Sequence, residues 1–260
     1  MESTARRAPA PRRAGALLAN IARSVLDEHF TAKWEALGPY WTRQKLRRQG
    51  VPTYRLIRYA DDFVVMVGGT KADAEGLWEE LSTVLSTVGL RLAREKSRVC
   101  HIDEGLDFLG FRIQRRPWSS RPGKTAIYTY PSKRSLMAII DKVRTLTRRA
   151  RHRTLADLLH AINPVLRGWC NYFSHGASSR SFGYLDHFTF WRIVGWLRKR
   201  HLGLNWGTLA RRYLPNWEIR DGREELFRPT AVAITRYRYR GARIPTPWTE
   251  NLDLVESRMR

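Results

Sequence analysis

Two adjacent aspartates, Asp61 and Asp62, stand between two short runs rich in apolar residues, at positions 54–58 and 63–67. Such runs on either side of a tight link predict a β-hairpin over residues 53–67, although the link lacks an Asn-Gly turn signal. Two carboxylates on so short a link can hold a divalent cation against a phosphate, because Mg²⁺ prefers carboxylate and phosphate oxygens. The plainer interpretation is a solvated Asp-Asp turn, and it stays open at this point.

The charge balance predicts a polyanionic partner. The chain of 260 residues has a formal net charge of +23, and self-repulsion of this size adds nothing to folding stability. No stretch approaches about 18 consecutive apolar residues, so nucleic acid is expected as the partner and a membrane is not. Residues 115–153 hold twelve basic side chains and one acid, whereas residues 71–110 hold five basic and eight acidic ones. A boundary between a near-neutral and a basic unit is therefore predicted within residues 115–123, which are rich in Pro, Ser and Gly.

The first half has the pattern of an α+β fold of the kind found in polymerase palms. Apolar spacing predicts amphipathic helices over residues 17–34 and 70–88, the second capped by Thr70 and ended by Gly89. Short strands are predicted at residues 90–92 and 98–102. A longer strand is predicted at residues 106–113, where Gly110 allows a close backbone approach.

The second half is predicted to be mainly helical. Phe188 and Trp191 are interpreted as core residues. Arginine and tyrosine alternate over residues 236–240, which predicts a strand over residues 234–240. The expected helices are residues 133–151 with Ser132 as cap, a helix beginning at Thr154, a helix beginning at Pro164 with Asn163 as cap, and residues 182–202.

The two cysteines, Cys100 and Cys170, are interpreted as packing or surface residues. They are far apart and lack the paired spacing of a zinc site, although His101 and His175 lie nearby. Residues 1–16 form a basic, low-complexity leader, interpreted as a disordered arm in preference to an organelle transit peptide.

Several motifs together resemble those of a known family. Tyr-Ala-Asp-Asp-Phe at 59–63, Gly-Leu-Arg-Leu at 89–92 with Glu-Lys-Ser at 95–97, and Leu-Asp-Phe-Leu-Gly-Phe at 106–111 resemble the later motifs of reverse transcriptases encoded by group II introns. Leu-Leu-Ala-Asn-Ile at 17–21 looks like the helix after this family's Gly-Ser-Pro motif. Residues 162–173 and 188–202 are similar to its maturase-specific region. The resemblance runs in the family's order from about residue 17 to residue 248.

The resemblance implies an α+β fold in which a partial polymerase palm precedes a mainly helical thumb and maturase region. The expected domains are the leader at 1–16, a partial palm at 17–116, a basic thumb-like helical region at 117–153, and a maturase-specific RNA-binding domain at 154–260.

The resemblance also implies roles for individual residues. Asp61 and Asp62 would bind Mg²⁺, and nucleotide addition in intact members uses two ions about 3.5–4 Å apart. Lys96 would lie near the phosphates of the incoming nucleotide, although a solvated loop lysine is a rival interpretation. The residues expected at the substrate or primer strand are Tyr59, Ala60, Gly110 and Phe111, and for the last two an ordinary core strand is an equal alternative.

The chain also departs from the family pattern. Intact members have a fingers region and an earlier strand that bears a further metal-binding aspartate. Upstream of Asp61 the acidic residues are Glu2, Asp27, Glu28 and Glu35, and none lies in a predicted strand. No endonuclease domain rich in His and Cys is expected after residue 248. Holding two metals with two of three carboxylates should cost several kcal/mol of transition-state stabilisation, so a polymerase that is poor or inactive by itself is expected.

RNA binding does not depend on that aspartate. The predicted partners are structured intron RNA and primer DNA, with deoxynucleoside triphosphates as substrates of an active enzyme. A bacterial cytoplasmic location is expected ahead of an organelle. The alternative function is a non-catalytic, maturase-like protein that assists intron folding and splicing. The residues expected to contact phosphates are Lys133, Arg134, Arg144, Arg148, Arg149, Arg151 and Arg153, and those expected to stack on bases are Trp169, Tyr172, Tyr237 and Tyr239.

Overall fold

The computed structural model describes residues 12–118, 122–148 and 154–236, with side chains from residue 24 onward except that of Lys96. The chain divides into two compact units. Unit 1 comprises Met1–Leu109 and Ile113–Ala126, and unit 2 comprises Gly110–Arg112 and Ile127–Arg260. Both helices and small antiparallel sheets are present, so the predicted α+β class is confirmed.

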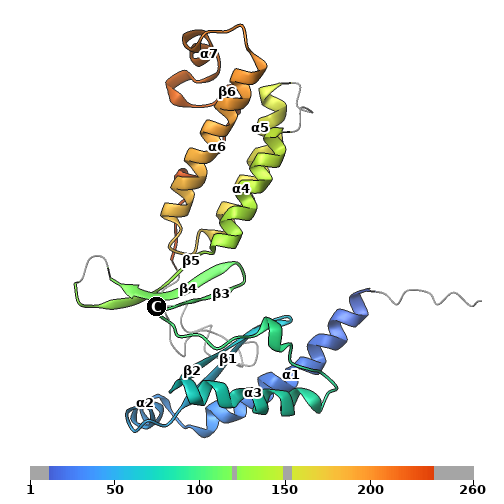
Figure 1. Ribbon diagram of the computed structural model, residues 1–260, viewed down its shortest axis with the longest axis vertical. Coiled ribbons are helices and arrows are strands. Elements are labelled where there is room, and N and C mark those ends of the chain that lie inside the picture. Colours follow the sequence, from blue (N-terminus) through green and yellow to red (C-terminus); the bar gives the residue numbers. More distant parts are fainter. Residues whose placement is uncertain (1–11, 119–121, 149–153, 237–260) are drawn as a thin grey trace, which may run out of the picture. The chain divides into compact units, whose positions relative to one another are not determined.

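Unit 1 is built around the predicted hairpin, which is confirmed. Its strands pair antiparallel in a register that joins Thr53 to Gly68 and Tyr59 to Asp62, so the loop has two residues. Figure 1 shows the hairpin with the neighbouring helices, coloured blue to cyan. The elements of this part are α1 (Arg12–Ala36), α2 (Tyr40–Arg48), β1 (Thr53–Tyr59), β2 (Asp62–Gly68), α3 (Lys71–Ser86) and η1 (Arg94–Lys96).

One face of the hairpin covers a small hydrophobic core. Strand residues alternate between the two faces, and Tyr54, Leu56 and Val65 are among those packed against this core. The buried core side chains come from α1 and α3, namely Leu26, Phe30, Leu77, Leu81 and Leu85. The helices therefore support the hairpin from one side.

The ends of α3 are those predicted. Thr70 accepts a hydrogen bond from the Asp73 backbone N–H, and the Asp73 carboxylate accepts one from the Thr70 backbone N–H, which completes a capping box. At the other end, Gly89 has a φ of +72°, and the Leu90 N–H donates to the Leu85 carbonyl. This is the Schellman arrangement, in which a left-handed residue closes the last turn.

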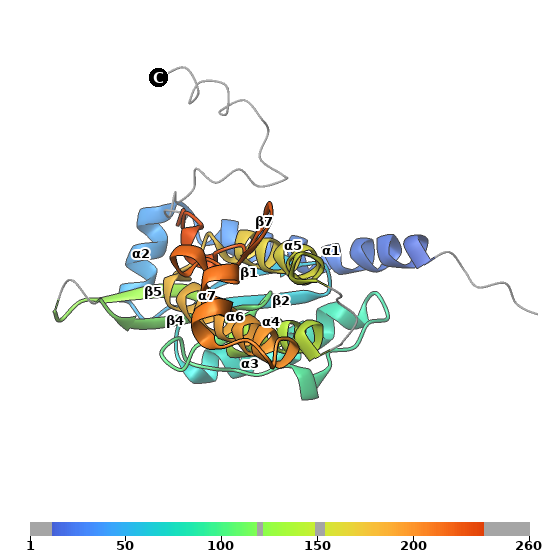
Figure 2. The same cartoon turned by 90° about the horizontal axis from the view of Figure 1, so that it is seen from above.

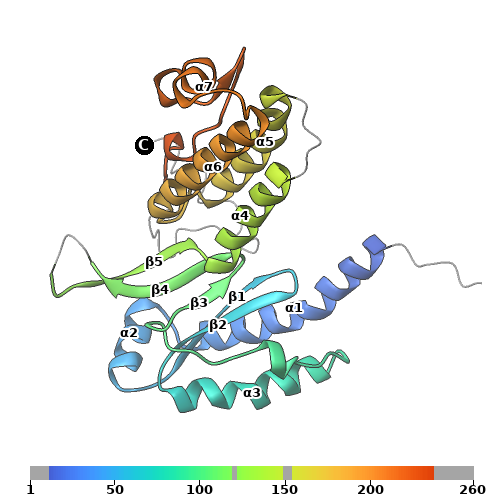
Figure 3. The ribbon, with the colours of Figure 1, turned by 45° about the horizontal axis from the view of Figure 1, so that its top comes forward.

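The strands predicted at residues 90–92 and 98–102 are wrong. These residues are irregular on either side of η1, because no described strand pairs with them. The single strand predicted at residues 106–113 is also wrong, since Leu109 and Gly110 form a turn that divides it into β3 (Leu106–Phe108) and β4 (Phe111–Pro117). Their φ values of +49° and +79° fit the tight type I′ turns of hairpins. β4 lies between β3 and β5 (Thr125–Pro131) in a three-stranded sheet (Figure 3).

Unit 2 is mainly helical, as predicted. The helices α4 and α6 run side by side with α5 packed against them, in Figure 1 and, seen from above, in Figure 2. The elements are α4 (Lys133–Arg148), α5 (Leu155–Phe173), α6 (Ser179–Arg200), α7 (Trp206–Tyr213), η2 (Pro215–Trp217), β6 (Arg220–Asp221), β7 (Glu224–Glu225) and η3 (Pro229–Ala231).

The core of unit 2 is larger than that of unit 1. Most of its buried side chains come from the three long helices, and others come from α7 and the segment after it. Ile140, Leu158 and Ile193 are fully inaccessible to solvent. The predicted Ser132 cap and the predicted helix start at Thr154 are confirmed. Ser132 Oγ accepts from the Ser135 N–H at the start of α4, and Thr154 forms a capping box with Asp157 at the start of α5.

The helix start predicted at Asn163 and Pro164 is wrong, because both residues lie inside α5. The Asn163 side chain makes tertiary contacts in place of a cap. Its amide donates to the Glu225 carbonyl at 2.8 Å, and its oxygen accepts from the Phe227 N–H at 2.9 Å. The buried stripe of α5 continues on both sides of Pro164, so packing outweighs the hydrogen bond that a proline removes.

The alternating strand predicted at residues 234–240 falls mostly outside the described residues. Residues 234–236 are described and are irregular. No helix in the described part of the chain is long and apolar enough to cross a membrane.

Candidate metal and nucleic-acid sites

The carboxylate pair lies at the exposed end of the β1–β2 hairpin. Asp61 is the second residue of the turn, and Asp62 begins β2 opposite Tyr59. Ala60, the first turn residue, has a φ of +52°, the left-handed backbone that tight hairpin turns require. Asp61 and Asp62 are both exposed, so their oxygens are accessible to a cation and its bound phosphate.

Arg58 fixes the turn to the helix below it. Its Nε donates to Asp27 Oδ2 at 2.8 Å, its Nη2 donates to the same oxygen, and its Nη1 donates to the Ala60 carbonyl at 3.1 Å. Both side chains are largely shielded from solvent, which reduces screening of the ion pair. The sequence interpretation assigned no role to Arg58. A charged residue on the otherwise apolar, core-facing side of β1 is the signal that could identify it.

A second ion pair joins α1 to α3 beneath the hairpin. Glu80 accepts hydrogen bonds from Lys33 Nζ at 2.6 and 2.7 Å and is bonded to His29 Nε2 at 2.6 Å. Burial raises the pKa of Glu80, but the hydrogen bonds and charges of His29 and Lys33 outweigh it and leave the pKa below its ordinary value. Lys33 Nζ also lies 4.3 Å from the centre of the Tyr54 ring on β1. These contacts hold the base of the hairpin rigid.

The donor atoms at the hairpin end suit Mg²⁺. Carboxylate oxygens are the ligands that this ion prefers, and it keeps several waters when few protein ligands are present. Within the described residues, no three His, Cys, Asp or Glu side chains come together as a metal cluster. Asp61 and Asp62 thus present carboxylate oxygens at one exposed turn that Arg58 holds in place, and their role as metal ligands stays a prediction.

Of the other residues expected at the substrate, Tyr59 and Ala60 belong to the same hairpin, whereas Lys96, Gly110 and Phe111 lie further along the chain. Tyr59 is 66% exposed beside the carboxylates, whereas Lys96 ends η1 and its side chain is outside the described atoms. The Gly110 carbonyl accepts from the Ser132 N–H and from Ser135 Oγ, both at 2.9 Å. A Cβ on Gly110 would lie 2.9 Å from Ser135 Oγ, so the turn approaches α4 too closely for a side chain.

Phe111 packs on α5. Its ring centre lies 4.7 Å from that of Phe173 and 5.5 Å from that of Tyr172. These contacts are those of the core-strand interpretation that was open for Gly110 and Phe111. A role for either residue at the primer strand stays a prediction.

The predicted phosphate contacts on α4 differ in their surroundings. Lys133, Arg134 and Arg148 are exposed. Arg144 is half-buried, donates to Asp141 at 2.8 Å, and lies 5.4 Å from the centre of the Phe188 ring. The predicted contacts Arg149, Arg151 and Arg153 lie outside the described residues.

The aromatic predictions divide in the same way. Trp169 packs against Phe173 with ring centres 4.6 Å apart, whereas Tyr172 is 53% exposed. Phe188 is packed against the core as predicted, but Trp191 is 48% exposed, so its assignment to the core is wrong. Trp191 lies on the side of α6 that carries Arg192 and Gly195 and lines a surface pocket there. Tyr237 and Tyr239 lie outside the described residues.

Cys170 occupies the core of unit 2. It is completely buried, and burial raises the pKa of its thiol to about 12, with the charge of Asp186 adding to the effect. A thiol with so high a pKa stays protonated at neutral pH and is a poor nucleophile or ligand. Its surroundings agree with a packing role.

Two segments of the chain match family models. Residues 14–113 match the model described as reverse transcriptase (RNA-dependent DNA polymerase), and residues 136–214 match the model described as group II intron, maturase-specific domain. The polymerase match precedes the maturase match along the chain. The chain belongs to the family of group II intron reverse transcriptases and maturases.

Individual relatives match parts of the chain. Protein YkfC of Escherichia coli is 39% identical over 104 residues, which cover 37% of this chain and 27% of YkfC. The group II intron-encoded protein LtrA of Lactococcus lactis subsp. cremoris is 25% identical over 172 residues, which cover 57% of this chain and 29% of LtrA. A putative COX1/OXI3 intron 2 protein of Saccharomyces cerevisiae is 33% identical over 67 residues, 25% of this chain and 8% of that protein. The matches thus span less than a third of each relative's length.

Proposed function

We propose that this chain binds structured intron RNA through unit 2 and contributes Asp61 and Asp62 to metal-dependent nucleotidyl transfer. In this proposal unit 1 is part of a polymerase palm, α4 belongs to the thumb, and the later helices form the maturase-specific domain. Membership of the family supports all three assignments. A bacterial cytoplasmic setting is the expectation that goes with them.

The observation that carries RNA binding is the charge on α4 and α6. Each helix has five basic side chains and one acidic one. Arg134, Arg148 and Lys199 are exposed on these two packed helices. A duplex or folded RNA presents closely spaced phosphates, and neutralising them releases counterions, which makes such binding strong at low salt.

In catalysis, the side chains of this chain would bind the metal ion and keep its ligands in position. Bound Mg²⁺ would supply activation of a primer hydroxyl and stabilisation of the leaving pyrophosphate. Asp61 and Asp62 would hold the ion with their oxygens, and Arg58 would keep their turn in one conformation through Asp27 and the Ala60 carbonyl. Pre-positioned charge of this kind is usually a large part of catalysis, because it costs no reorganisation during the reaction.

The non-catalytic maturase-like function is the second candidate. It is favoured by the location of the basic helices, because α4 and α6 belong to unit 2 and the carboxylate hairpin belongs to unit 1. RNA binding can then persist without nucleotidyl transfer.

Two assays test the proposal. Fluorescence anisotropy with a folded group II intron RNA should show binding by the wild-type chain. Primer extension with Mg²⁺ and deoxynucleoside triphosphates should show at most weak synthesis, and Asp61→Ala should remove it. Failure to bind the RNA at low salt would refute the proposal, and synthesis that survives Asp61→Ala would refute the metal assignment.

A further inference from the structure

A pocket of about 420 Å³ lies on unit 2 where the C-terminal part of α6 meets the end of α4. Thr147 and Arg148 contribute from α4, and six residues between positions 191 and 200 contribute from α6. These two helices are packed together, so the pocket belongs to one unit (Figure 1). Its volume falls within the range of roughly 300–1,000 Å³ that is typical of small-molecule sites.

The lining of this pocket is cationic. Four of its eight residues are basic, namely Arg148, Arg192, Lys199 and Arg200, and none is acidic. The C-terminal ends of α4 and α6 each carry about half a negative charge from the helix dipole. The two ends together offset about one of the four positive charges, so a strongly positive field is left. The pocket therefore favours an anion.

Aromatic surface accompanies this charge. Trp191 is 48% exposed, and Trp196 lines the pocket while it also packs on the core. The Arg200 guanidinium lies 5.5 Å from the centre of the Trp196 ring, and Arg192 Nε donates to Thr147 Oγ at 2.8 Å. These contacts hold two arginines and a tryptophan in place before any ligand arrives. Flat rings beside fixed cations match a base joined to a phosphate.

Further rings lie next to Trp191 on the same unit. Its ring centre is 5.3 Å from that of Phe190, which is 6.2 Å from Trp217, which is 6.3 Å from Trp206. Trp217 is 65% exposed and has a φ of +63°, a backbone conformation that is unfavourable for a bulky residue. Phe190 packs against the core, whereas Trp191, Trp206 and Trp217 are exposed. Exposed rings of this kind suit unpaired bases, because every base can stack on an aromatic face.

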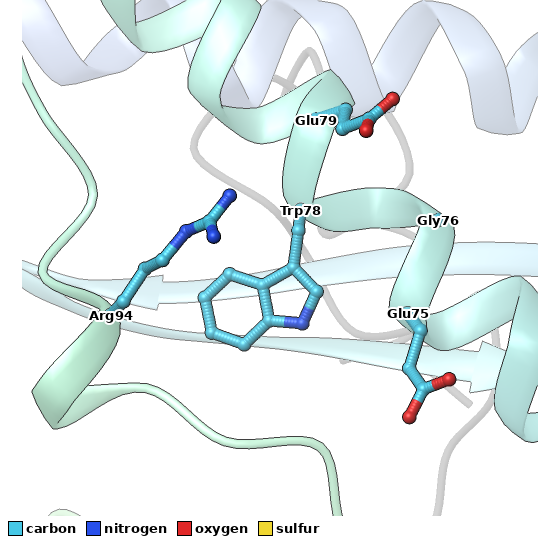
Figure 4. A pocket seen from close by; sticks show the side chains of 5 residues that line it. All are labelled: Glu75, Gly76, Trp78, Glu79 and Arg94. Atoms are coloured by element: carbon cyan, nitrogen blue, oxygen red, sulfur yellow. The ribbon is translucent and has the colours of Figure 1, made fainter.

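A second pocket of similar volume, on α3 in unit 1, provides a contrast. It also contains a tryptophan and an arginine, Trp78 and Arg94, with Glu75 and Glu79 beside them (Figure 4). Two carboxylates and one guanidinium leave a negative balance that repels phosphate. A tryptophan beside an arginine is thus not enough to indicate a nucleotide site. The α4–α6 pocket differs because no acidic residue lines it.

We propose that the α4–α6 pocket binds an unpaired RNA nucleotide, with its base against Trp191 and Trp196 and its phosphates against the surrounding basic side chains. This inference rests on the proposed RNA binding and specifies its ligand as single-stranded RNA. Phosphate contacts alone would accept a duplex equally well, whereas a base can enter a pocket only when it is unpaired.

Gly195 provides a sharp test because it lines the pocket without filling it. No atom lies within 4 Å of the position that a Cβ on Gly195 would take. The Cβ of Gly195→Leu therefore meets open space, and the added side chain occupies pocket volume without changing the charge. Leucine also favours a helix more than glycine does. Gly183→Leu is the matched control, since Gly183 is also in α6, is also half-buried and also has open space around its Cβ position.

The experiment measures anisotropy with two RNA probes, an unpaired single-stranded oligoadenylate and a perfect duplex with the same number of phosphates. Gly195→Leu should bind the oligoadenylate roughly tenfold more weakly, the loss typical of one stacked base, and should bind the duplex as the wild type does. Trp191→Ala should show the same loss, with the exposed Trp41→Ala in unit 1 as its control. Circular dichroism verifies that each variant is folded.

The outcomes separate this inference from the function on which it rests. A wild-type chain that binds neither probe refutes RNA binding and this inference with it. A wild-type chain that binds both probes, with Gly195→Leu and Trp191→Ala binding oligoadenylate unchanged, refutes the pocket alone. Tighter binding of poly-glutamate than of either RNA, lost in Gly195→Leu, would overturn the inference in favour of an acidic protein segment.

Discussion

The two units differ in how their charged side chains are used. In unit 1 several acids pair with bases, Asp27 with Arg58 and Glu80 with Lys33 in partly buried positions and Asp103 with Arg115 at the surface. In unit 2 the bases of α4 and α6 greatly outnumber the acids, and Arg148 and Lys199 are exposed.

Basic side chains in unit 1 therefore stabilise the fold through ion pairs. In unit 2 they lie at the surface, where the proposed RNA would bind. Unit 1 uses ion pairs to hold a hairpin in place, and its carboxylates Asp61 and Asp62 lie at the end that the pairs support. Unit 2 obtains its stability from a larger apolar core and leaves its positive charge at the surface. Each of the following predictions tests one side of this comparison.

The largest expected effect is the salt dependence of RNA binding. Roughly six to ten phosphate contacts should reduce the affinity by about 10³–10⁵ between 50 and 200 mM salt. Anisotropy titrations at a series of salt concentrations measure the slope. A weak slope with a structured RNA would mean that the excess charge of unit 2 has another use.

The next effect concerns the two cores. Among the described residues, twenty buried side chains form the core of unit 2 and five form that of unit 1. Leu158→Ala, at a completely buried position, should lower the free energy of unfolding by about 2–5 kcal/mol. Leu81→Ala, at a position that is 7% exposed, should cost less. Denaturant unfolding of both variants measures the two losses of unfolding free energy. A larger loss for Leu81→Ala than for Leu158→Ala would contradict this difference between the cores.

A smaller effect is expected from the two capping boxes, which have the same chemistry in different units. Thr70→Ala removes the cap of α3 and Thr154→Ala that of α5, and each should cost about 1 kcal/mol. Hydrogen exchange of the first turn of each helix reports the loss locally. Equal losses would confirm that cap strength is a local property, and a loss several times larger in one unit would show that its helix end carries further contacts.

The smallest effect is the pH dependence from Glu80. Because its pKa is lowered in the folded state, its stabilisation is present above the ordinary value of 4.5 and is lost as the pH falls through the folded-state pKa. Thermal unfolding should therefore show unit 1 losing stability below about pH 4.5. Glu80→Gln should flatten that part of the profile, and an unchanged profile would exclude this contribution.

Much of the fold could be predicted from the sequence because local patterns determine it. The hairpin, the Thr70 cap, the helix start at Thr154 and the Gly89 helix stop follow from residues close in sequence, and all are present. Errors arose where distant contacts decide the structure. The local sequence predicts Asn163 as a cap, but its side chain bonds to the backbone of Glu225 and Phe227.

The candidate site shows the same limit. Asp61 and Asp62 were identified from their spacing, whereas Arg58 and Trp191 were not, because their roles depend on partners that the spacing does not reveal. Arg58 reaches Asp27, 31 positions earlier in the chain. Trp191 belongs to an aromatic helix whose exposed side is defined only by its packing against α4 and α5.

In the proposed function, RNA binding belongs to unit 2 and does not require the carboxylates of unit 1. The most direct test of this claim is anisotropy with one folded intron RNA and two double variants, Asp61→Asn with Asp62→Asn, and Lys199→Glu with Arg200→Glu. The first variant should bind at least as tightly as the wild type, and the second should lose about tenfold or more because at least two phosphate contacts are reversed. Loss of RNA binding in the aspartate variant, with normal binding in the basic one, would contradict the claim.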